Sequence, residues 1–107
     1  MGEADKWASG QWQVKEGRTD DFVERWKIWL GWTSESIPGF RSARLLRSQD
    51  DSNRFTSVSD WDDDAALAAW ANHPGFQEKF GAVRELCDDF RGGNFDLAAS
   101  IPGPAGA

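Results

Sequence analysis

The sequence predicts an α+β domain whose elements follow the order strand, helix, strand, strand, helix, strand. Alternation of apolar and polar residues predicts strands over 6–14, 55–61 and 94–101. Segment 40–47 is expected to pair antiparallel with 55–61 across the turn-rich loop 48–53. Helical periodicity fills the two longer intervals between strands. This order is the ferredoxin-like βαββαβ pattern, in which helices cover one face of a four-stranded antiparallel sheet.

The first strand, 6–14, and the helix after it carry five of the seven tryptophans. In the strand, Trp12 shares a face with Gly10, and a glycine at this place indicates a bulge or a close approach by a ligand or by backbone. Thr19 is expected to cap the helix, which Pro38 and Gly39 end. The apolar stripe of this helix consists of Phe22, Trp26, Trp29 and Leu30.

The third strand ends at Trp61, which shares a face with Phe55, Ser57 and Ser59. The acidic run 62–64 follows, and short carboxylates there are expected to cap a helix rather than to bind a cation. We expect this second helix to break near Pro74, with the proline in the first position of the resumed helix. The stripe of the resumed helix is predicted to run through Phe76, Phe80, Val83, Cys87 and Phe90.

Length and composition predict one domain over 1–107, with flexible tails at 1–5 and 102–107. A net charge of −6 argues against a nucleic-acid partner, and no apolar run is long enough for a membrane span. The amino terminus lacks the apolar region of a signal peptide. Cys87 is the only cysteine, as expected in the reducing cytoplasm, and its place on an apolar stripe predicts an inert thiol.

Seven tryptophans without a tyrosine are more than a small core hides easily, so some are expected in a pocket or a subunit contact. With helices on one face of the sheet, the other face needs a cover. The simplest cover is the same face of a second copy. We therefore predict a homodimer.

The segments VKEGRTDDF, IPGFRSARLLR and RFTSVSDWDDDAALAAWANHPGFQEKF resemble, in order and spacing, the antibiotic biosynthesis monooxygenase family over roughly residues 12–101. The resemblance implies a dimeric α/β barrel with a pocket between sheet and helices in each subunit. Members include cofactor-free anthrone oxygenases, haem-degrading enzymes and proteins of no known activity, so membership does not fix the reaction.

The residues of the known sites match only in part. Trp61 stands where the anthrone oxygenases have a functional tryptophan, but Ser57 replaces their asparagine and Leu67 their tyrosine. Trp70 fits the helix tryptophan of the haem-degrading members. Phe80 stands in place of their iron-ligating histidine, and Gly10 and Gln11 occupy the region of their asparagine, which disfavours haem.

Each candidate residue has a functional and a structural interpretation. In the functional interpretation Trp61 donates a hydrogen bond to a developing oxyanion, and in the structural one it is a core residue. His73, the only histidine, is a general base, or an exposed linker residue. Ser57 holds a catalytic water, or is only a small sheet residue. The predicted substrate-binding residues, which equally suit a core, are Trp70, Phe76, Leu67 and Trp26.

Two functions fit the sequence. The first is a cofactor-independent monooxygenase that uses no cofactor or metal and adds O2 to a hydrophobic aromatic molecule of polyketide or quinol type. In it Trp61, His73 and Ser57 are catalytic. The alternative is a dimer that binds such a molecule without turning it over. A haem-degrading enzyme ranks third.

Overall fold

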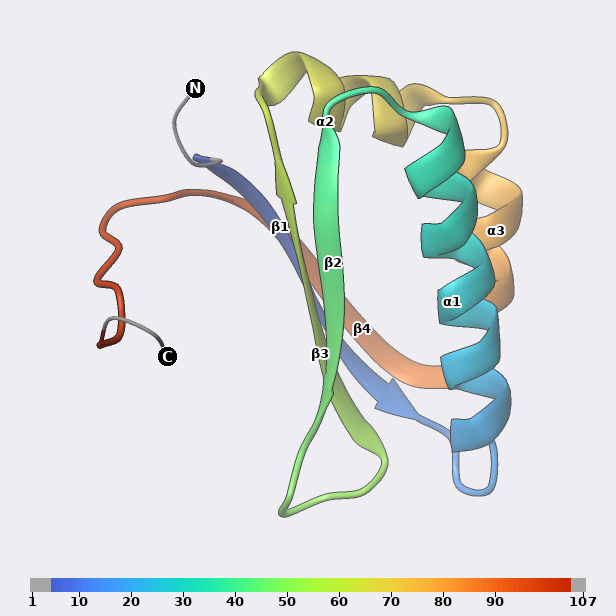
Figure 1. Cartoon of the computed structure of the whole chain (residues 1–107). Helices are drawn as coiled ribbons and strands as arrows, with labels where there is room; N and C mark the ends of the chain where they lie inside the picture. The colour runs from blue at the N-terminus through green and yellow to red at the C-terminus, as the bar shows by residue number, and fades with distance from the viewer. Residues whose placement is uncertain (1–4, 105–107) are drawn as a thin grey trace.

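A computed structural model of the chain describes residues 5–104. Its elements follow the predicted order, with the second helical segment in two pieces. They are β1 (Lys6–Val14), α1 (Thr19–Ser36), β2 (Phe40–Arg47), β3 (Arg54–Trp61), α2 (Asp64–Asn72), α3 (Phe76–Arg84) and β4 (Cys87–Asp96). Figure 1 shows α1 and α3 side by side, with α2 across one end of the sheet.

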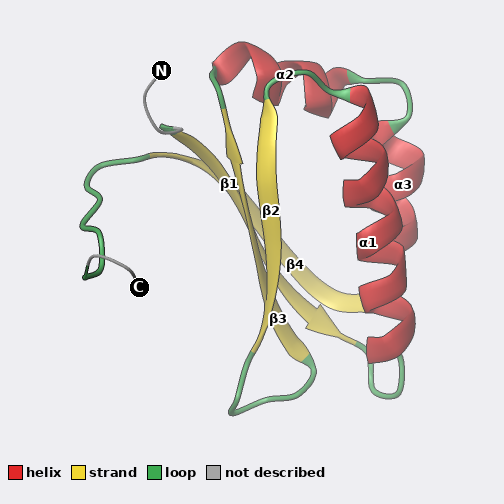
Figure 2. Ribbon diagram, viewed as in Figure 1, coloured by secondary structure: helices red, strands yellow, loops and turns green. Residues whose placement is uncertain are grey.

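The four strands form one antiparallel sheet in the order β2-β3-β1-β4. All three helices lie on one side of it, as Figure 2 shows. This arrangement confirms the predicted ferredoxin-like fold. The first three strands lie within one residue of their predicted bounds, and in β1 and β3 the alternation marks the half-buried face.

The fourth strand does not lie where the alternation predicted it. It was expected over 94–101, but it runs from Cys87 to Asp96, and residues 97–104 are in neither helix nor strand. Cys87 and Phe90 therefore lie on β4, and the predicted helical stripe through them is wrong beyond Val83. Helix α3 ends at Arg84 because the chain then pairs with β1, where Phe90 lies opposite Trp12.

Two of the three helix starts differ from the prediction. Arg18 precedes α1 without a side-chain cap, so Thr19 does not cap that helix, and Arg18 instead pairs with Asp21 at 3.1 Å. Helix α3 begins at Phe76, two residues after Pro74, which lies in the preceding turn. The start of α2 is as predicted, because Asp63 Oδ1 accepts the Ala66 N–H at 2.9 Å.

Gly39 fixes how α2 meets the sheet. Its φ of 94° lies in the left-handed region, and a Cβ there would stand 2.5 Å from the Cβ of Ala66. The Gly39 carbonyl accepts the Asp62 N–H at 2.8 Å. A glycine is thus required on two grounds, and it lets α2 close over the end of β2 and β3.

The predicted flexible tails fall largely outside the description. Residues 1–4 and 105–107 are not among the described residues. Asp5 is exposed, but its carbonyl accepts the Leu97 N–H at 2.8 Å, and residues 102–104 are exposed and irregular. No helix in the described part of the chain is long and apolar enough to span a bilayer.

The core lies between the sheet and the helices and is mainly aromatic. Five of the seven tryptophans are buried there, whereas Trp7 and Trp32 are half-buried. Trp12 alone packs against four other rings at centroid distances of 4.3–6.1 Å. Burial of so much ring surface gives this small domain its main stabilisation.

Candidate functional site

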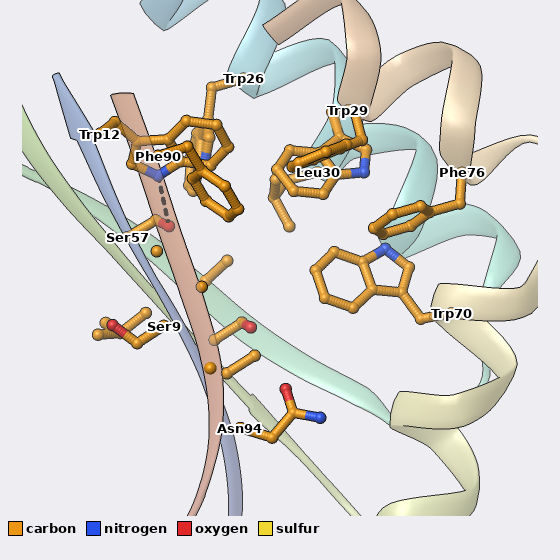
Figure 3. Close-up of a pocket in the computed structure, with 18 residues that line it drawn as sticks. Ser9, Trp12, Trp26, Trp29, Leu30, Ser57, Trp70, Phe76, Phe90 and Asn94 are labelled. Atoms are coloured by element: carbon orange, nitrogen blue, oxygen red, sulfur yellow. Dashed lines mark hydrogen bonds between the residues drawn. The ribbon is translucent and has the colours of Figure 1, made fainter. Parts of the chain in front are cut away.

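A cavity of about 190 Å³ lies between the sheet and the helices. Figure 3 shows Trp29, Trp70 and Phe76 facing the strands across it, with Trp12 and Phe90 toward one end. Gly92, Gly93 and Asn94 line it and are exposed, so it reaches solvent along the edge of β4. For scale, an apolar cavity of about 150 Å³ holds benzene. The space therefore suits one or two fused rings, with larger groups outside.

The sheet side of the cavity is a floor of small residues from all four strands. They are Ala8 and Gly10 of β1, Ala43 of β2, Ser57 and Ser59 of β3, and Gly92 of β4. These residues share the helix-facing side because Gly10 pairs with Ser57 and with Gly92, and Ala8 with Ser59. The cavity exists because large side chains are absent from this part of the sheet.

Gly10 was expected to mark a bulge or a close approach by a ligand or by backbone, but the groups close to it are side chains. A Cβ at Gly10 would lie 2.8 Å from both Trp12 Nε1 and Ser57 Oγ. The approaching group is the indole of Trp12, which leans back over Gly10 to reach Ser57. The glycine therefore makes room for a side chain of its own strand and does not mark a bulge.

The opposite wall is made of rings held by one another and by a hydroxyl. Trp29 and Trp70 stack at 5.3 Å with an interplanar angle of 17°, and Phe76 meets both edge-on. Trp70 Nε1 donates to Thr33 Oγ1 at 2.9 Å, and that hydroxyl donates to the Trp29 carbonyl. The wall is thus rigid, because α1 and α2 are joined by a buried hydrogen bond.

The polar groups of the cavity are few and uncharged. The side chains that carry them are Ser57, Ser59, Asn94 and the indoles of the lining tryptophans, whereas the Ser9 side chain points to the other face of the sheet. Ser57 Oγ accepts from Trp12 Nε1 at 3.0 Å, and Ser59 Oγ accepts from Trp61 Nε1 at 2.9 Å. No Asp, Glu, His, Lys, Arg or Cys is among the described residues that line it.

Two further indole donors border the cavity without a partner. Trp26 and Trp29 line it, and in the described structure the Nε1 atom of each is buried without a hydrogen-bond acceptor. A buried donor left unpaired costs about 1–3 kcal/mol. Both are therefore available to an oxygen that reaches them.

Cys87 is buried but does not line the cavity. Burial raises the pKa of the Cys87 thiol to about 11, and its Sγ donates to the Val83 carbonyl, so this thiol is uncharged and not a nucleophile near neutral pH. Across the described residues, no three His, Cys, Asp or Glu side chains gather as a metal site would require.

The structure brings four of the seven predicted site residues to the cavity, namely Ser57, Trp70, Phe76 and Trp26. Trp61 is fully buried beside it, and its N–H already donates to Ser59. Leu67 is buried but is not among the lining residues. Trp61 and Leu67 are thus neighbours of the site in this structure rather than parts of its surface.

His73 lies away from the cavity. Its Nδ1 accepts the Gly75 N–H at 3.0 Å, which shapes the turn between α2 and α3. Its ring meets Trp32 edge-on at 4.9 Å, and Lys79 Nζ lies 5.1 Å from the centroid of the same Trp32 ring. Trp32, which lies off the main stripe of α1, thus makes a second contact on the helical side.

Several lining residues were not proposed from the sequence. Trp12, Ser59, Phe80 and Phe90 are the main ones, together with Trp29. Alternation had placed Trp12 and Ser59 on definite faces of their strands, but only the register of β1 against β3 shows that these faces coincide. Phe90 was missed because its strand was missed.

Comparisons with known proteins agree with this architecture. The family model of the antibiotic biosynthesis monooxygenases matches residues 8–81. No curated protein is significantly similar to the sequence. The chain is similar in structure to SnoaB, a cofactor-independent oxygenase from Streptomyces nogalater, with a TM-score of 0.84 and 23% identity over 94% of this chain and 100% of that one.

Two further solved structures show the same fold. A point mutant of SnoaB gives a TM-score of 0.85 at 22% identity, with the same coverage. A conserved protein from Methanosarcina mazei Go1 gives 0.77 at 16% identity over 87% of this chain and 92% of that one. At such identities these likenesses establish the fold, whereas the family model spans more than half of the sequence. The chain belongs to the antibiotic biosynthesis monooxygenase family.

Proposed function

We propose that the protein is a cofactor-independent monooxygenase for a planar, oxygen-bearing aromatic molecule of polyketide or quinol type. The observation that carries the proposal is the cavity itself, a narrow slot between small sheet residues and aromatic rings with a few uncharged donors. Such a slot holds a flat ring, which displaces most of the water when it enters, and admits apolar O2. The likeness in fold to SnoaB adds support.

The reaction needs no reductant, since the substrate supplies the electrons. An activated methylene of an anthrone-like ring loses a proton, and the resulting anion reduces O2 and combines with it to give a hydroperoxide. Loss of water then leaves a carbonyl: one oxygen atom enters the product and the other leaves as water. The protein's part is to exclude solvent and to hydrogen-bond the oxygen that becomes an oxyanion.

The site departs from the expected roles in its proton acceptor. His73 does not line the cavity, so the remaining candidate is a water molecule held at Ser57. A water is a weak base, which limits the reaction to substrates that ionise readily near neutral pH. Anthrones and quinols ionise above neutral pH in water, so the hydrogen-bond donors of the cavity must stabilise the substrate oxyanion and lower that pKa.

The test is oxygen consumption with an anthrone, with product identified by mass spectrometry. We expect wild type to consume O2 and to form the quinone. Ser57→Ala is expected to lower the rate about ten- to a hundredfold, whereas His73→Ala leaves it within about twofold because His73 is outside the cavity. A rate indifferent to Ser57→Ala, or no consumption above the uncatalysed reaction, contradicts the proposal.

The second candidate is a non-catalytic dimer that binds the same class of molecule. It is favoured by one observation, that no described side chain lining the cavity ionises. It predicts saturable quenching of tryptophan fluorescence by an aromatic ligand with no O2 consumed. The same lining contains no His, Cys, Met or Tyr to ligate haem iron, which weighs against the haem-degrading role. Addition of hemin without a Soret shift excludes that role.

The homodimer remains part of the proposal. The face of the sheet away from the helices carries Trp7, Val58, Leu46 and Phe95 among polar and charged side chains. Leu46 and Phe95 are 53% and 56% exposed, and Phe95 lies beside Trp7 across β1 and β4. The same face of a second copy provides a matching surface.

A further inference from the structure

Two serines on β3 are held by indoles in the same way. The Trp12 N–H reaches Ser57 at 3.0 Å and the Trp61 N–H reaches Ser59 at 2.9 Å. An indole nitrogen is a donor only, so each serine oxygen is the acceptor in its pair. The serines pair with Gly10 and Ala8 across β1, so both hydroxyls stand on the cavity side of the sheet.

Each hydroxyl keeps its own proton. Among the residues that the structure describes, neither Ser57 nor Ser59 donates a hydrogen bond. Ser59 is 6% exposed, and the open space beside both hydroxyls is the cavity. A buried O–H without an acceptor is unfavourable, and an N–H bond to its oxygen makes it a stronger donor. The pair is therefore set to donate to oxygen atoms inside the cavity.

We propose that Ser57 and Ser59 are two ligand-binding donors, and that Trp12 and Trp61 act through them as positioning residues. This inference deepens the proposed function and rests on the same cavity. It gives Trp61 a defined part: it orients Ser59 without touching the ligand. Figure 3 shows the Trp12–Ser57 pair at the edge of the cavity, below Phe90.

The spacing of the pair selects a class of ligand. Residues two apart on one strand face lie about 6.5–7 Å apart. Each O–H···O bond spans roughly 2.7 Å and can lean inward. Two ligand oxygens on neighbouring ring carbons could meet both donors only if both hydrogen bonds leaned strongly inward. Oxygens on opposite edges of a ring, as in a 1,4-quinone or a 9,10-anthraquinone, suit the pair.

The experiment compares two ligands of the same ring shape. The probe is 2,3-dimethyl-1,4-naphthoquinone, which bears both oxygens and is blocked against attack by thiols; the control ligand is 2,3-dimethylnaphthalene. Binding to the whole protein is followed by tryptophan fluorescence. Ser57→Ala and Ser59→Ala are each expected to raise the Kd of the quinone about five- to tenfold. The Kd of the hydrocarbon should stay within about twofold of wild type.

Further variants separate positioning from structure. Trp61→Phe and Trp12→Phe keep a ring but lose the N–H, so we expect a smaller but still quinone-selective loss. Ser59→Thr keeps the hydroxyl and is expected to restore quinone binding. Ser34→Ala, on the exposed surface of α1, is the matched control and should change neither Kd. Equal losses for both ligands, or a quinone Kd unchanged by both serine substitutions, overturn the inference.

A measurement on the wild type alone tests the inference even if the variants do not fold. The infrared carbonyl bands of the bound quinone should lie below their positions in an apolar solvent, because both carbonyls accept hydrogen bonds. Unshifted carbonyl bands overturn the inference. The quinone is already oxidised and needs no turnover, so a protein that binds it selectively but consumes no O2 refutes the proposed reaction and leaves the two donors standing.

Discussion

The two faces of the sheet are built on opposite principles. On the helix side, small residues of four strands lie beneath a wall of rings, and the polar atoms are few and uncharged. On the other side, Gln11, Arg54, Arg91 and Asp89 stand among scattered apolar groups. One face of the sheet forms a cavity of defined shape, and the other carries a mixture of charged, polar and apolar side chains, although the same strands supply both.

The difference shows where a small domain places its binding surface. Small residues in a sheet usually weaken it, because they bury little area. Here they are grouped on one face, and the rings of α1, α2 and α3 supply the lost contacts from the opposite wall. The open face keeps ordinary strand residues and is free to meet a partner. Substitutions on the two faces should therefore have unequal consequences.

The largest difference is expected for a matched pair on β1. Trp12→Ala removes a ring that is 2% exposed and packed against four others, and should lower the free energy of unfolding by about 3–5 kcal/mol. Gln11→Ala, one residue away on the open face, should change it by less than about 0.5 kcal/mol. Urea denaturation measures both, and equal losses contradict the contrast.

A methyl group added to the floor should cost less but still be clear. In Gly10→Ala the new Cβ displaces Trp12 Nε1 or Ser57 Oγ, each only 2.8 Å away, at about 1–3 kcal/mol of stability. Gly81→Ala in α3 meets nothing within 4 Å and should stabilise the protein by roughly 0.5–1 kcal/mol. Thermal unfolding checks the opposite signs; two shifts of the same sign would refute the account of Gly10.

Cys87 reports on the same buried layer through pH. Burial raises the pKa of the Cys87 thiol from 9.0 to about 11. As pH rises from 9 to 11 the thiol ionises in the unfolded protein but stays protonated in the folded one. The contribution of Cys87 to the free energy of unfolding is therefore complete below pH 9 and is lost as pH rises toward 11. We expect a loss of roughly 1–2 kcal/mol over that range, absent in Cys87→Ala. Alkylation by iodoacetamide at pH 8 should be about a hundredfold slower in the folded protein than in urea. Similar alkylation rates would contradict the burial.

The smallest effect on the subunit itself is expected from the open face. Trp7 and Phe95 are neighbours across β1 and β4, and the double variant Trp7→Glu with Phe95→Glu should alter the folding of the single subunit by about 1 kcal/mol or less. If this face joins two copies, the same variant converts the dimer to a monomer. Sedimentation at micromolar concentration measures the mass. A wild type that is monomeric there contradicts the dimer.

Much of the fold could be predicted because its signals are local. Trp61 and the acidic run after it mark the end of one strand and the start of one helix, and both lie as predicted. The fourth strand could not be located in this way. Cys87 and Phe90 continue the three- and four-residue spacing of α3, and only pairing with β1 makes them a strand. Residues 97–101 alternate just as well but lack such a partner among the described strands.

The sequence predicted several residues that line the candidate site, but not the hydrogen bonds and contacts between them. The abundance of tryptophan indicated a pocket, and Ser57, Trp70, Phe76 and Trp26 do line one. The indole–serine bonds depend on register and rotamer, which composition does not encode. His73 is the only histidine in the sequence, but the fold places it at a turn outside the cavity.

The stacked wall has an optical consequence. Trp70 lies 5.3 Å from Trp29 and 4.8 Å from Trp61, close enough for their electronic transitions to couple. Circular dichroism in the far ultraviolet will then contain an exciton contribution that is unrelated to helix content. Estimates of secondary structure from such spectra will be distorted, but the same band gives an intrinsic, label-free signal that changes when a molecule slides beneath these rings.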